Sequence, residues 1–266
     1  MFFVAAPALL LATLVSTPVA GVFTPAFTAY LASTLLVGAA ALAVARWRWR
    51  LPRGEAVVAT LAAGYGNAGY LGIPVAAFVL GDVSYAVPVL LFQVLVVAPV
   101  VLAVLDAGPD RGRLRAAVAL PVRNPVVAAC AVGLAVTLSG WRPAAELRWP
   151  FEVVGASAIP LAVLALGLSL GGARPLAGGP DAEPRYAVVA LKVLVQPAVA
   201  YLVGRALGLS GTLLLAGVAM AGLPTAQNVF VYAVRFRQAP GLARDAVVLS
   251  TLAAAGTLLA IALWLG

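Results

Sequence analysis

Residues 64–74 read Gly64-Tyr-Gly-Asn-Ala-Gly-Tyr-Leu-Gly-Ile-Pro74, and this stretch lies inside a long apolar segment. It holds four glycines, an asparagine and a proline, residues that weaken or interrupt an α-helix. Proline has no N–H, so Pro74 deprives the carbonyl of Tyr70 of its helical partner. Non-helical backbone at membrane depth is tolerated only where protein buries it or where it lines a wet cavity. The stretch therefore predicts an interrupted helix.

The composition is that of a polytopic membrane protein. Of the 266 residues, 64% are hydrophobic and 10% are charged, and the mean hydropathy is +1.07. A span needs about 20 apolar residues, which predicts an all-α fold with several spans. We predict nine, at 1–20, 23–45, 56–80, 84–105, 124–141, 153–171, 186–207, 212–234 and 245–265.

The arginines follow this topology. Most fall on one side of the predicted spans: Arg46, Arg48, Arg50, Arg53, Arg111, Arg113, Arg115, Arg123, Arg174, Arg185, Arg235, Arg237 and Arg244. Only Arg142, Arg148 and Arg205 fall on the other side. The positive-inside rule predicts a multi-pass protein of the cell membrane with these basic connections in the cytoplasm and the C-terminus outside. It also explains the net charge of +8 without nucleic acid as a partner.

The composition argues against catalysis and against a bound metal ion. The chain has no histidine and one cysteine, Cys130, which excludes an internal disulfide and a His/Cys metal cluster. No acidic residue falls in the middle of a predicted span, and no phosphate-binding loop is present. We expect no catalytic residue, no metal, no cofactor and no direct use of ATP.

Two pairs of segments indicate an internal repeat. Residues 5–14 (AAPALLLATL) resemble 158–167 (AIPLAVLALG), and 72–80 (GIPVAAFVL) resemble 222–230 (GLPTAQNVF). The order is the same, and the paired prolines are 67 and 64 residues apart. A five-helix unit occurring twice inserts its halves in opposite orientations, as in secondary transporters.

The repeat also predicts the domain organisation. The first repeat is residues 1–106, a basic cytoplasmic loop is 107–123, and the second repeat is 124–266. The span at 124–141 has no counterpart in the first half, so a first helix is apparently missing.

Matched interruptions in the two halves are the best pointer to a transporter's binding site. Polar and helix-breaking residues gather at both, and we predict a substrate site formed by Asn67, Gly72, Pro74, Pro224, Thr225, Gln227, Asn228 and Lys192. Amides can donate to a carboxylate without carrying charge, or they can merely join helices. Lys192 could attract an anion or extend to the membrane interface.

Five segments resemble the auxin efflux carrier family of the bile acid/auxin transporter-like superfamily. They are GNAGYLGIPV (66–75), RNPVVAA (123–129), AIPLAVLALGLSL (158–170), LKVLVQP (191–197) and GLPTAQNVFVYAVR (222–235). The resemblance implies ten helices in an inverted 5+5 repeat with two crossing, proline-broken helices, here 56–80 and 212–234. It implies a scaffold part from the first two helices of each repeat and a transport part from the last three. It also implies that Asn67 contacts the substrate carboxylate. A second proline of plant members is replaced here by Val229.

The expected function is a secondary transporter that moves small organic anions by alternating access. The expected partners are that anion and the lipid bilayer, and a homodimer is left open. One alternative is a relative of the bile-acid/sodium symporters, for which the sequence lacks a clear cluster of sodium ligands. Another is a truncated membrane protein that does not transport.

Overall fold

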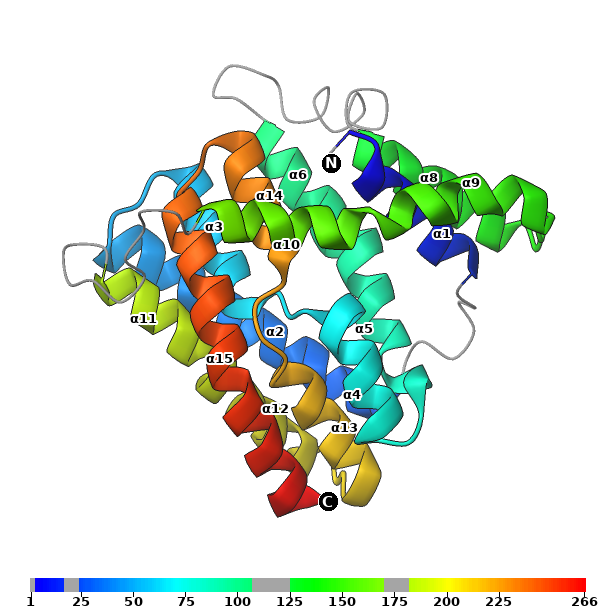
Figure 1. Cartoon of the computed structure of the whole chain (residues 1–266). Coiled ribbons are helices and arrows are strands. Elements are labelled where there is room, and N and C mark those ends of the chain that lie inside the picture. Colours follow the sequence, from blue (N-terminus) through cyan, green and yellow to red (C-terminus); the bar gives the residue numbers. More distant parts are fainter. Residues whose placement is uncertain (1–2, 17–23, 107–124, 170–181) are drawn as a thin grey trace. The chain divides into compact units, whose positions relative to one another are not determined.

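The computed structural model describes residues 3–16, 24–106, 125–169 and 182–266, which form helices and no strand (Figure 1). The predicted basic loop 107–123 lies outside these residues, as does Arg174.

The chain folds into two compact units, each assembled from two stretches of sequence. Unit 1 comprises residues 1–20 and 91–168, and unit 2 comprises 21–90 and 169–266. Each unit draws on both predicted repeats. Except for the stretch after residue 90, the division follows the scaffold and transport parts that the family resemblance implies.

Unit 1 contains α1 (Ala5–Ser16), η4 (Gln93–Val97), α6 (Ala98–Asp106), α8 (Pro125–Leu138), α9 (Ala145–Ala156) and α10 (Ala158–Ser169). Helix α1 packs against α8 and α9 (Figure 1). Two glycines make room for it: a Cβ on Gly133 would lie 2.9 Å from Cβ of Leu14, and one on Gly155 would lie 2.7 Å from Cα of Leu9. Small residues at these positions let the helix backbones approach closely.

Unit 2 contains the helices on either side of both predicted interruptions. They are α2 (Pro25–Ala43) with η1 (Val44–Arg48), α3 (Arg53–Gly64), η2 (Ala68–Gly72), α4 (Ile73–Phe78), η3 (Val83–Tyr85), α11 (Ala182–Ala190), η5 (Leu191–Val195), α12 (Gln196–Ala206), α13 (Gly211–Ala221), α14 (Gln227–Phe236) and α15 (Pro240–Leu265). Helix α5 (Val87–Phe92) crosses the boundary between the units.

Helix α13 is the centre of unit 2, because its residues from Leu214 to Ala221 are buried on every side. It packs against α2, α12 and α15. The buried face of α2 combines small residues, such as Ala29 and Ser33, with the larger Phe27 and Tyr30. This arrangement of a helix buried all round is typical of the interior of a membrane bundle.

The surface of the described chain is apolar, as expected for contact with lipid. Large side chains stand exposed on long helices, among them Leu36 on α2, Leu202 on α12 and Leu252 on α15. Among the described residues, four helical stretches are long and apolar enough to cross a membrane: Pro25–Arg48, Val87–Leu105, Ala182–Ala206 and Pro240–Leu265. These observations agree with a multi-pass membrane protein. The nine spans and the inverted repeat stay predictions.

Candidate functional site

Both predicted interruptions exist, and they pair with each other inside unit 2. Helix α3 ends at Gly64 and helical structure resumes at Ala68, while α13 ends at Ala221 and α14 begins at Gln227. The intervening backbones form an antiparallel bridge between Gly66 and Thr225.

Two main-chain hydrogen bonds close this bridge. The N–H of Asn67 donates to the carbonyl of Pro224 at 2.7 Å, and the N–H of Ala226 donates to the carbonyl of Tyr65 at 3.0 Å. Each broken segment therefore supplies partners that the other lost by leaving the helix, which is how non-helical backbone survives inside a membrane bundle. We call residues 65–67 and 222–226 together the crossing.

The first interruption lies upstream of its predicted place. Pro74 was expected to break the helix, but it lies inside a continuous helical stretch, Ala68–Phe78, and the chain leaves helical geometry at Tyr65 instead. Pro74 therefore removes one helical hydrogen bond without ending the helix. In η2 the helix widens, and the N–H of Gly72 donates to the carbonyl of Asn67, five residues back. The second interruption contains Pro224, as predicted.

The C-terminal ends of the two half-helices α3 and α13 face the same helix, the continuous stretch from α11 to α12. Lys192 donates to the carbonyl of Ala221 at 2.8 Å and to Oε1 of Gln196. Gln196 in turn donates to Oγ1 of Thr34 at 2.9 Å and lies 3.5 Å from the carbonyl of Gly64. Carbonyls at helix C-termini have no partner within the helix, so these two side chains satisfy groups that the interruptions leave free.

Lys192 does not extend to the membrane interface. Its side chain is 0% exposed, and its ammonium group is directed at the end of α13. Of the two interpretations that the sequence left open, the structure supports an internal role.

The N-terminal ends at the crossing are the part suited to an anion. Asn67 caps η2: its Oδ1 accepts the N–H of Tyr70 at 3.2 Å, which leaves the amide NH₂ as the group that can donate elsewhere. Helix α14 begins after Ala226, and no side chain caps it. Helix N-termini carry free N–H groups and partial positive charge.

Gln227 and Asn228 lie in this first turn of α14, and both are partly buried. Within the described residues, the buried Oε1 of Gln227 has no hydrogen-bond partner. Buried polar atoms are nearly always paired, so this acceptor oxygen is open to a hydrogen-bond donor.

Thr225 is fully buried, and its bonds go to protein. Its N–H donates to Oγ of Ser250 at 2.9 Å, and its Oγ1 donates to the carbonyl of Ala62 at 2.7 Å. This residue fastens the crossing to α15 and α3. Gly72 also serves packing, since a Cβ there would lie 3.1 Å from Cδ1 of Leu223.

Comparison with known proteins identifies the chain. A family model described as "Membrane transport protein" matches residues 114–264, more than half of the sequence. A protein of Rhizobium meliloti (strain 1021) named "Putative malonate transporter" is 30% identical over 237 residues, which cover 85% of this chain and 72% of that protein. The chain belongs to this family of membrane transport proteins. The resemblance to the auxin efflux carriers is thereby confirmed, and the transporter is not an enzyme.

Some buried or partly buried polar residues of unit 2 in this transporter carried little signal in the sequence. Ser250 and Thr34 are single polar residues in apolar helices, and nothing in their spacing marks them. Asp245 was placed at the end of a span, but its side chain is buried between Arg185, at 2.8 Å, and Arg244, at 2.7 Å. This buried cluster of one carboxylate and two guanidinium groups forms because α11 packs against α15. A single sequence does not reveal that packing.

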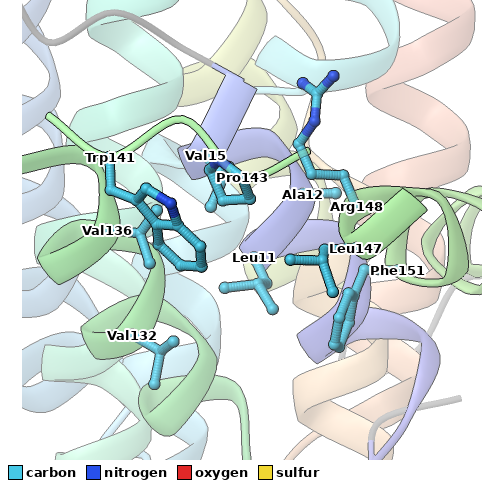
Figure 2. Close-up of a pocket in the computed structure, with 10 residues that line it drawn as sticks. All are labelled: Leu11, Ala12, Val15, Val132, Val136, Trp141, Pro143, Leu147, Arg148 and Phe151. Carbon is cyan, nitrogen blue, oxygen red and sulfur yellow. The ribbon is translucent and has the colours of Figure 1, made fainter. Parts of the chain in front are cut away.

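Unit 1 of the transporter contains a cavity of about 270 Å³ (Figure 2). Its lining is apolar apart from one arginine and consists of Leu11, Ala12, Val15, Val132, Val136, Trp141, Pro143, Leu147, Arg148 and Phe151. It contains none of the predicted site residues. In the described part of the chain, no cluster of His, Cys, Asp or Glu could hold a metal ion.

Proposed function

We propose that this protein is a secondary transporter that moves small organic anions, specifically carboxylates, across the cytoplasmic membrane by alternating access. The observation that carries the proposal is the antiparallel bridge between Gly66 and Thr225, which brings two interrupted helices together in one unit. Interrupted helices of this kind hold substrate in many secondary transporters.

The chemistry of the crossing favours an anion. The NH₂ group of Asn67 and the uncapped first turn of α14 both offer N–H donors. Hydrogen bonds to a carboxylate are charge-assisted and are about twice as strong as neutral ones. In this proposal the amide NH₂ groups of Asn67, Gln227 and Asn228 donate to the carboxylate.

The other predicted site residues hold the crossing in shape. Pro224 accepts the N–H of Asn67, and Thr225 binds α3 and α15. Gly72 admits Leu223, and Lys192 binds the end of α13. Pro74 is the exception, because it lies beyond the crossing, inside the helical stretch Ala68–Phe78. Unit 2 then carries the substrate, and alternating access comes from its movement relative to unit 1.

The similar Rhizobium protein suggests the substrate to try first. Its name refers to malonate, a small dicarboxylate. We infer that malonate or a related acid of two to four carbons binds at the crossing. The basic connections, represented among the described residues by Arg48, Arg50 and Arg53, would face the cytoplasm.

The test is a binding screen of the purified full chain followed by a transport assay. Thermal unfolding is measured with mono- and dicarboxylates, each at several pH values and with sodium or choline as the cation. A compound that stabilises the protein is then studied in proteoliposomes, where preloaded unlabelled compound should drive uptake of the labelled one. Binding of amines or neutral solutes in preference to every carboxylate would refute the proposed substrate class.

A further inference from the structure

Lys192 is the single lysine in the sequence, and its ammonium group lies at the crossing rather than at the membrane surface. It belongs to η5, and its side chain is completely buried. Among the ion pairs found in the described residues, none includes Lys192. Its positive charge is therefore balanced by something other than a carboxylate of those residues.

The balancing group is the end of a helix. Ala221 is the last residue of α13, and its carbonyl accepts the ammonium N–H at 2.8 Å. A helix C-terminus carries a partial negative charge, which falls off within about one turn, so the ammonium stands where that charge is strongest. The amide oxygen of Gln196 is the second acceptor.

The other interrupted segment approaches the same ammonium. A Cβ built on Gly66 would lie 3.5 Å from Nζ of Lys192, so the backbone of this segment passes close by. The carbonyl of Gly64, at the end of α3, lies within reach of Gln196. The ammonium of Lys192 and the amide of Gln196 therefore lie at the C-terminal, partly negative ends of the half-helices α13 and α3.

In other secondary transporters, unwound carbonyls and half-helix C-termini coordinate the coupling Na⁺. A sodium ion needs what this ammonium has: a cluster of oxygen atoms at the negative end of a broken helix. We propose that Lys192 is a resident cation of the crossing, which occupies the place of a coupling sodium ion, so that this transporter assembles its binding site without Na⁺. This inference depends on the proposed function in one respect: the binding site that Lys192 helps to assemble is taken to be the site of the transported anion.

The first test uses the unmodified protein and two variants, studied in sodium chloride and in choline chloride at equal ionic strength. Lys192→Gln removes the charge and leaves an amide oxygen in its place, which completes a set of oxygen ligands with Ala221 and Gln196. We expect the Tm of the unmodified protein to be the same in both salts. The Tm of Lys192→Gln should be lower in choline and should rise in sodium by about 3 °C or more, as for a ligand that binds only the folded state.

Ser250→Ala is the matched control, because it removes a buried hydrogen bond to Thr225 from the same crossing without changing charge. It should lower the Tm equally in both salts. A sodium-dependent Tm in the unmodified protein would overturn the proposal. So would a folded Lys192→Gln variant with no response to sodium.

A second measurement covers the case in which Lys192→Gln does not fold. Because the chain has one lysine, protein labelled with ¹⁵N-lysine gives a single side-chain signal. The ¹⁵Nζ shift should be that of an ammonium group at neutral pH, and the signal of a neutral amine would overturn the proposal. Malonate binding, measured separately, tests the proposed function: malonate can fail to bind while the sodium response of Lys192→Gln still appears.

Discussion

Replacing Asn67 by alanine removes two hydrogen bonds with different consequences. The first joins Oδ1 to the N–H of Tyr70 at 3.2 Å and caps η2, and loss of such a cap costs about 1 kcal/mol of stability. The second is the proposed bond from the NH₂ group to the substrate carboxylate. A hydrogen bond to a charged group contributes about 1.5–3 kcal/mol, so affinity should fall by roughly 10- to 150-fold.

Asn67→Ser separates these two effects. Serine caps a helix about as well as asparagine does, but it has no amide NH₂ to reach the substrate. We therefore expect Asn67→Ser to unfold near the temperature of the unmodified protein, while its affinity for malonate, measured by isothermal titration, falls nearly as far as that of Asn67→Ala. The main chain of residue 67 keeps its bond to Pro224 in both variants, so the crossing itself persists. If Asn67→Ser binds malonate as tightly as the unmodified protein, the amide does not contact the carboxylate and the reasoning is wrong.

Three further changes test the packing of unit 2, its buried ion pairs and the place of its first interruption. Gly217→Ala should lower the free energy of unfolding, measured by thermal unfolding, by about 1–3 kcal/mol, because its Cβ would lie 2.9 Å from a main-chain oxygen of α2. Gly256→Ala is the control, because a Cβ there meets open space, and it should not destabilise the protein in the same assay. Asp245→Asn leaves two arginines without their buried acid. It should lower the free energy of unfolding, measured by chemical denaturation, by a few kcal/mol, roughly the loss expected for a broken buried ion pair. In the same assay Glu183→Gln should cost less than about 1 kcal/mol, because the ion pair of Glu183 with an arginine is exposed. Pro74→Ala should leave malonate binding intact in a titration, since the chain leaves the helix before this residue; loss of binding by a folded variant would show that Pro74 governs the interruption after all.

The meeting of two interrupted segments could be predicted from the sequence, because helix breaks at corresponding positions of the two halves are characteristic of a transporter's binding site. The place of the first break could not. Helix propensity singles out Pro74, yet the helix continues through this residue, and the break at Tyr65 is selected by hydrogen bonds to a segment about 160 residues away in the chain.

Burial was also beyond the reach of the sequence. From the sequence, the side chain of Lys192 could equally face a cavity or extend to the membrane interface. Only the packing of α13 against the neighbouring helices shows that this side chain is buried. Ser250 is one serine in the apolar α15, and its role follows from which face of that helix meets Thr225. The orientation in the membrane, which follows from the distribution of arginine and not from packing, stays a prediction.

The bonds that join the two segments at the crossing belong to the peptide backbone, as the pairs from Asn67 to Pro224 and from Ala226 to Tyr65 show. A frame made in this way does not depend on which side chains project from it. If Asn67, Gln227 and Asn228 contact the substrate as proposed, mutations there alter the acid that is recognised while the frame survives. Related proteins can then diverge in substrate without first rebuilding their architecture.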